Sequence, residues 1–169
     1  KEQLPPWTVI VGITGGPILG REKVEARAAD VRDIARDFDL TLAPDVPGCR
    51  GDDLLALIQK PSAAPYWKLR AKGGAQELFF LTTLDRTLDH VATMQAAAGA
   101  HDYPLPDVGV YIQPVHQGVG CHCEFILSFR RDSEIEVKRT TALFRDASRR
   151  LRDGQAFFSR PYGIWADMV

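Results

Sequence analysis

Two histidines and two cysteines fall within eight positions of the stretch PVHQGVGCHCEFILSF, residues 114–129. These residue types bind zinc when three or four of them converge on one point. The second half of the stretch has the composition of a β-strand, however, and side chains on a strand alternate between its two faces. Cys121 and Cys123 should then point away from His122, so we predict no metal site here.

One face of this predicted strand is apolar and carries both cysteines. Its members are Cys121, Cys123, Phe125, Leu127 and Phe129. A free cysteine packs like a small hydrophobic residue. We therefore expect this face to lie in the core.

The opposite face of the same strand carries His122, Glu124, Ile126 and Ser128. It is too polar for a surface covered by helices, and His122 and Glu124 are groups able to exchange protons. Two interpretations stay open at this point. The face is a functional surface, or it is an ordinary solvated face of an antiparallel sheet.

The segment GQAFFSRPYGIWADMV, residues 154–169, sets Arg160 among aromatic residues: Phe158, Tyr162 and Trp165. An arginine in such surroundings is suited to stacking or to binding a planar anion. The alternative is a structural arginine that ties down the end of the chain.

The periodicity of the sequence predicts the elements that position these residues. Strands are expected where β-branched or aromatic residues cluster between turn signals, at 7–13, 77–84, 108–115, 121–129 and, briefly, 155–159. Helices are expected where apolar residues recur every three or four positions, at 21–38, 84–98 and 133–151. The segment 43–76 is rich in Pro, Gly and Asp and predicts a long excursion within one domain, with a short helix near 54–58.

The spacing of apolar residues also predicts which side of the second helix faces the core. The inner stripe of the second helix is predicted at Leu84, Leu88, Val91, Gln95 and Ala98.

The last helix should begin with a capping box formed by Ser133 and Glu136, and it should end at Gly154 in a left-handed conformation. Pro114 favours a strand end, an edge or a bulge. The element order as a whole predicts an α+β fold, with a ferredoxin-like antiparallel sheet and helices on one face.

Composition narrows the classes of function. The 169 residues carry 21 Lys and Arg against 22 Asp and Glu, a net charge of -1, which gives no general attraction to nucleic acid or to anionic membranes. No apolar run reaches the roughly 18 to 20 residues that span a bilayer. Three cysteines do not form a disulfide framework, so we expect a reducing compartment such as the cytoplasm.

Four stretches, in this order, resemble the substrate (cap) domain of the vanillyl-alcohol oxidase and p-cresol methylhydroxylase family of FAD-linked oxidases. These are PWTVIVGITGGP, GGAQELFFLTTL, GVYIQPVHQGVGCHCEFILSF and AFFSRPYGIWADMV. The resemblance implies that residues 1–169 form the C-terminal cap domain of an FAD-dependent oxidoreductase. An FAD-binding domain outside this chain would hold the nucleotide, and the open face of the sheet would cover the flavin ring.

The resemblance also implies catalytic roles. His122 matches a histidine near the pocket, and Arg160 matches an arginine that helps to stabilise a phenolate. Glu124 would orient His122.

Further residues are implied at the pocket border. Those expected to contact the substrate are Ser159, Tyr162, Gln113 and Tyr111; those expected to lie against FAD are Glu77 and Phe79. Two of them depart from the family pattern: Ser159 replaces a phenol-anchoring tyrosine, and Glu77 replaces the histidine that carries FAD in covalently flavinylated relatives. The resemblance thus implies a non-covalent flavin at this domain.

The function implied is oxidation of an aromatic alcohol, phenolic or benzylic, or of a related hydroxy compound, by hydride transfer to flavin. The implied partners are the FAD-binding domain of the same protein, a small aromatic substrate and a second copy of the chain, with no nucleic acid and no membrane. An alternative from another class is a non-catalytic ferredoxin-like module that uses the open sheet face to bind a small ligand or to dimerise.

Overall fold

The computed structural model describes residues 5, 7–60, 67–115, 118–161 and 163–168. The chain divides into two compact units, residues 1–63 and residues 64–169. The division falls inside the segment that the sequence predicts as an excursion of one domain. Each unit is described here by itself.

The first unit contains helix α1 (Gly20–Asp37) and helix α2 (Gly51–Gln59), close to where the sequence predicts them. The strand predicted at residues 7–13 is wrong, because the segment has no strand conformation and Val9 is 82% exposed. A strand is stabilised by backbone hydrogen bonds to a partner strand. No described segment of this unit pairs with residues 7–13, so β-propensity alone does not make them a strand.

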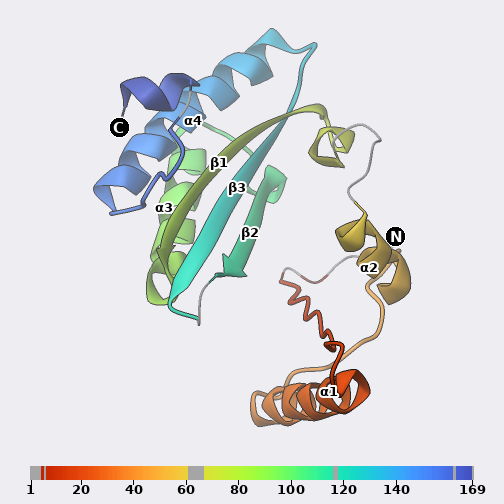
Figure 1. Cartoon of the computed structure of the whole chain (residues 1–169). Helices are drawn as coiled ribbons and strands as arrows, with labels where there is room; N and C mark the ends of the chain where they lie inside the picture. The colour runs from red at the N-terminus through yellow and green to blue at the C-terminus, as the bar shows by residue number, and fades with distance from the viewer. Residues whose placement is uncertain (1–4, 6, 61–66, 116–117, 162, 169) are drawn as a thin grey trace. The chain divides into compact units, whose positions relative to one another are not determined.

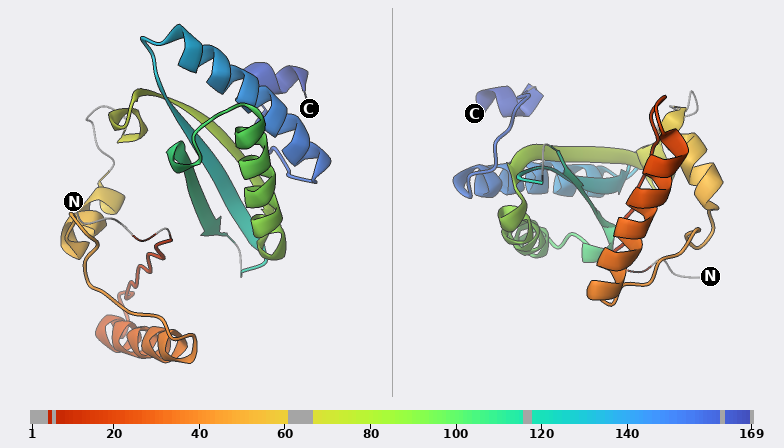
Figure 2. Two further views of the ribbon diagram at one scale, coloured as in Figure 1. Left: turned by 180° about the vertical axis from the view of Figure 1, so that it is seen from behind. Right: turned by 60° about the horizontal axis from the view of Figure 1, so that its bottom comes forward.

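The second unit is built on a three-stranded antiparallel sheet in the order β1-β3-β2. The strands are β1 (Gly73–Thr83), β2 (Val108–Pro114) and β3 (Gly120–Arg130), and Pro114 ends its strand as predicted. Helices α3 (Thr87–Ala100) and α4 (Glu134–Asp153) cover one face, as Figure 1 shows from the open side and Figure 2 from behind. The α+β, ferredoxin-like layout is confirmed.

The strand predicted at 155–159 is reduced to a single bridge. Phe157 pairs with Leu81 through two backbone hydrogen bonds, of 2.9 and 3.0 Å, on the edge of β1 away from β3. This bridge occupies the place of a fourth strand. Short 3-10 helices complete the unit at Trp67–Arg70 (η1), Leu84–Arg86 (η2), Leu105–Asp107 (η3) and Gly163–Asp167 (η4).

The core lies between the sheet and the two helices. Its sheet members include Leu78 and Phe80 on β1 and Cys123, Phe125 and Leu127 on β3; its helix members include Met94, Ala97, Leu143, Ala147 and Leu151. Cys121 is fully buried as well. The prediction that the cysteine face of β3 is buried is therefore confirmed for four of its five members, and Phe129 is half-buried.

The predicted inner stripe of α3 is shifted. Leu84, Leu88 and Gln95 are exposed, whereas Val91 and Ala98 are buried as predicted. The other buried side chains of the helix are Thr87, His90, Met94 and Ala97. Residues Leu84–Arg86 form the 3-10 turn η2, so the α-helical period begins only at Thr87. Counting from Leu84 therefore gives the wrong phase.

The ends of α4 follow the predicted signals in part. The Glu136 N–H donates to Ser133 Oγ at 3.4 Å, but the Glu136 carboxylate accepts from the Arg130 N–H at 2.9 Å instead of from Ser133. Gly154 has φ −79°, and the left-handed residue is the next one, Gln155, with φ 69°. No helix among the described residues is long and apolar enough to cross a membrane.

His90 introduces a titratable group into the helix layer. Its ring is 2% exposed and its Nε2 lies 2.9 Å from Thr82 Oγ1. Burial, with a further effect of the Arg86 charge, lowers the pKa of His90, and Asp89 opposes this in part. The folded protein therefore holds this imidazole neutral under conditions in which the unfolded chain protonates it.

Because the folded state binds fewer protons at this site, we expect the free energy of unfolding to fall as the pH drops below the ordinary histidine pKa of about 6.5. His90→Gln should flatten this slope between the ordinary pKa and the lowered one. Urea unfolding at a series of pH values measures it, with Gln95→Ala on the exposed side of the same helix as control. Equal slopes in all three proteins would contradict the assignment.

Candidate functional site

The open face of the sheet brings together all six strand residues that the sequence analysis singles out. Across β3, the strand register sets Phe79 and Tyr111 on either side of Glu124, and Leu81 and Gln113 on either side of His122. Directly paired residues of an antiparallel sheet point to the same face. Glu77 lies on this face too, opposite Ile126.

A lysine that the sequence analysis missed contacts two carboxylates of this face. The ammonium group of Lys68, from the short helix η1, contacts Glu124 Oε1 and lies 3.3 Å from Glu77 Oε1. Its side chain is only 7% exposed. We call Lys68, Glu77, Glu124 and His122 the sheet-face cluster.

Glu124 connects the lysine to the histidine. One of its carboxylate oxygens faces Lys68, and the other lies 3.5 Å from His122 Nε2. The Glu124 side chain is 11% exposed and the His122 side chain 28% exposed. The buried carboxylate is thus held from both sides, while the imidazole remains open to a ligand.

Two aromatic rings lie beside His122. The Phe79 ring stacks on His122 with centroids 6.1 Å apart, and the Tyr111 ring meets it edge-on, also at 6.1 Å. The Tyr111 hydroxyl donates to Gln113 Oε1 at 3.1 Å. The face therefore offers ring surface, a proton acceptor and amide groups within one small area.

The site residues predicted in the C-terminal segment are not bonded to the sheet-face cluster. Ser159 and Arg160 are exposed, and within the described part of the chain no hydrogen bond or ion pair joins them to the sheet-face cluster. Tyr162 lies outside the described residues. Trp165 anchors the segment, since its Nε1 donates to Ser148 Oγ at 2.9 Å and its ring packs edge-on against Phe79 at 5.1 Å.

The two buried cysteines have low reactivity. Burial raises the pKa of the Cys123 thiol to about 12, and Cys121 and Glu124 add to the effect; burial also raises the pKa of Cys121. Both thiols therefore stay protonated at neutral pH, which disfavours nucleophilic attack and metal binding. In the ranges that the structure describes, no group of three or more His, Cys, Asp or Glu side chains could hold a metal ion.

Sequence pattern could not reveal Lys68. It lies in a four-residue 3-10 turn with no hydrophobic period around it, and its contact with Glu124 spans 56 positions of the chain. The strand residues were recognisable because alternation alone places them on one face. Comparisons with protein families, with curated proteins and with solved structures find no match for this chain.

Removing the cation from this cluster tests its energetics. Lys68→Met should lower the free energy of unfolding by about 3 kcal/mol, because it leaves two partly buried carboxylates without their counter-ion. Chemical unfolding at neutral pH measures the loss. Lys138→Met, which breaks an exposed ion pair with Glu134, should change stability by at most about 0.5 kcal/mol.

The double variant Lys68→Met/Glu124→Gln separates charge from packing. It should regain part of the loss, since one of the orphaned charges is then gone. A double variant less stable than Lys68→Met would show that the charge of Glu124 is not what the lysine compensates.

Proposed function

We propose that this chain is the substrate-binding cap domain of an FAD-dependent oxidoreductase that oxidises an aromatic alcohol, phenolic or benzylic, or a related hydroxy compound. The observation that carries this proposal is the open sheet face, where a half-exposed histidine is held by a buried carboxylate and flanked by aromatic rings. The sequence resemblance to the vanillyl-alcohol oxidase family assigns the same face to the flavin ring and the substrate.

The residues of this face suit the ring of a flavin better than its phosphates. Phe79 and Tyr111 offer apolar ring surface, and Gln113 offers donors and acceptors for a ring edge. Glu77 is engaged with Lys68 and stands where the flavinylated relatives carry a histidine, so FAD would not be attached there through a histidyl link. In this proposal a separate domain of the same protein holds the FAD phosphates, and the bound flavin accepts the hydride.

The chain's own residues would handle the proton. In this proposal His122 would turn its Nε2 toward Glu124, whose Oε2 lies 3.5 Å away, and would use Nδ1 to accept the proton of a substrate hydroxyl. Glu124 keeps the imidazole in this orientation, and Lys68 keeps Glu124 in place. These are positioning roles that require no movement of charge through Lys68.

The C-terminal segment would complete the substrate pocket. Arg160 is exposed and makes no hydrogen bond or ion pair with any other described residue, so its guanidinium is available to stabilise negative charge on the substrate oxygen. Ser159 and Tyr162 would border the same pocket from this segment, and Tyr111 and Gln113 from β2.

A second candidate function has one observation in its favour. Among the described strands β2 pairs only with β3, so one edge of β2 is open, and Tyr111 is 46% exposed beside it. An open edge can pair with another strand. The alternative is therefore a non-catalytic ferredoxin-like module that binds a small ligand or dimerises.

A flavin spectrum and substituted forms of the longest native protein test the proposal. We expect a flavin absorption band and reduction of dichlorophenolindophenol with 4-hydroxybenzyl or benzyl alcohols. His122→Ala and Arg160→Ala should each lower kcat/KM by about 10²-fold, the usual scale for one preorganised group in a dry site. Arg149→Ala, an exposed arginine on α4, is the matched control.

The two candidate functions predict different results. A native protein without flavin that forms dimers sensitive to substitutions in β2 would favour the binding module. Normal turnover in both His122→Ala and Arg160→Ala would remove these residues from the proposed chemistry.

A further inference from the structure

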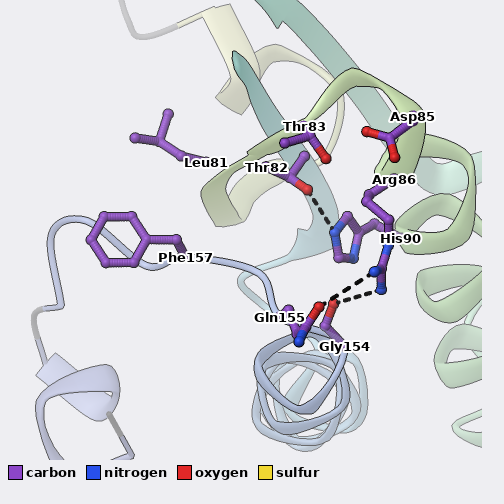
Figure 3. Close-up of a pocket in the computed structure, with 9 residues that line it drawn as sticks. All are labelled: Leu81, Thr82, Thr83, Asp85, Arg86, His90, Gly154, Gln155 and Phe157. Carbon is purple, nitrogen blue, oxygen red and sulfur yellow. Dashed lines mark hydrogen bonds between the residues drawn. The ribbon is translucent and has the colours of Figure 1, made fainter. Parts of the chain in front are cut away.

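A second site lies at the end of β1. A cavity of about 410 Å³ opens there between the start of α3 and the turn that follows α4, and no member of the sheet-face cluster lines it (Figure 3). Its polar lining includes Thr82, Thr83, Asp85, Arg86, His90 and Gln155. The volume is within the range of pockets that bind small molecules.

Arg86 is the cation of this cavity, and its contacts are weak. Its Nη1 and Nη2 donate to Gln155 Oε1 and to the Gly154 carbonyl, both at 3.3 Å. These distances are long for a charged donor, and both acceptors are neutral. Its Nε is buried without a hydrogen bond to any described residue, and Asp89 Oδ2 lies 3.5 Å away.

The wall behind Arg86 adds hydrogen-bonding groups without adding charge. His90 is almost fully buried, and its lowered pKa keeps the ring neutral at pH 7. Its Nε2 is occupied by Thr82 Oγ1. Arg86 is therefore the positive group in the cavity lining that an anion would bind.

The turn that faces Arg86 is strained. Gln155, which is not a glycine, has φ 69°, whereas Gly154 before it has an ordinary φ. Strain of this kind persists where the surrounding structure enforces it, often at ligand sites. In this turn the Gln155 side chain and the Gly154 carbonyl both face the guanidinium, as Figure 3 shows.

Two apolar side chains form the outer part of the cavity. Leu81 and Phe157 line it beside the polar groups, and Phe157 is 64% exposed. Asp85 also lines the cavity, and its carboxylate disfavours ligands with several negative charges. A ligand with one negative charge and an apolar body suits this combination.

We propose that this cavity binds a small monocarboxylate. The carboxylate pairs end-on with Nη1 and Nη2 of Arg86, replacing their long contacts to Gln155 and Gly154, and the apolar body packs on Leu81 and Phe157. This inference does not rest on the proposed oxidoreductase function, because none of the residues that line this cavity has a role in that proposal.

Benzoate and its neutral analogue benzamide are the probes. In ¹⁵N-¹H spectra of the full chain, benzoate should shift the amides of Leu81, Thr83, Gln155 and Phe157 in a saturable way. Benzamide should bind at least about tenfold more weakly, since the charged two-point contact is lost. Asp85→Asn should strengthen benzoate binding, because it removes a like charge.

A pair of arginine variants completes the experiment. Arg86→Gln should weaken benzoate binding about tenfold or more, whereas Arg145→Gln, an exposed arginine on α4, should leave it unchanged. Thermal melts check that each variant is folded. If Arg86→Gln melts early, the comparison of benzoate with benzamide on the unmodified chain decides.

Three results would overturn the proposal. The first is that benzoate at tens of millimolar shifts none of the four amides. The second is that benzamide binds as tightly as benzoate. The third is that a folded Arg86→Gln variant binds benzoate normally.

Discussion

The alternation of side chains along β3 is the constraint on which the second unit depends. This strand is hydrogen-bonded on both sides, so its neighbours β1 and β2 inherit its division into two faces. Cys123 and Phe125 point into the core, whereas His122 and Glu124 point to the open face. A slip of one residue would exchange the two sets, burying ionisable groups under the helices and exposing the apolar stripe, which fixes the register strongly.

The buried charges of the open face make most sense as a positioning device. A buried ion pair seldom stabilises a fold more than well-packed apolar residues of the same size would, because desolvation offsets much of the attraction. Lys68 with its two carboxylates is therefore not needed for stability as such, although removing one partner alone is costly. What the arrangement does provide is a Glu124 held by Lys68, with one carboxylate oxygen 3.5 Å from His122 Nε2 and the rings of Phe79 and Tyr111 beside the imidazole.

Features that depend on local period could be predicted from the sequence, and features that depend on distant partners could not. The three strands, the three long helices and the two faces of β3 follow from spacing alone. The segment 7–13 has strand-forming residues but no partner, the 3-10 turn at Leu84 shifts the phase of α3, and Lys68 becomes important only through contacts across the fold. The left-handed residue after α4 was predicted one position early, because glycine is only the preferred residue for that conformation and Gln155 adopts it here.

The two candidate sites differ in the charged groups that they present, and this gives each a distinct chemistry. The sheet-face cluster holds two carboxylates and one ammonium group, so a neutral hydroxyl compound is compatible with it and a carboxylate would meet repulsion from Glu77 and Glu124. The cavity at the end of β1 instead presents the Arg86 guanidinium beside the neutral His90 ring, with a single carboxylate, that of Asp85, in its lining. Under the two proposals, an aromatic carboxylate would bind in the cavity, and the corresponding uncharged alcohol would bind at the sheet face. Because the two surfaces share no polar side chain, occupation of one leaves the charges of the other unchanged, and the two proposals stand or fall separately.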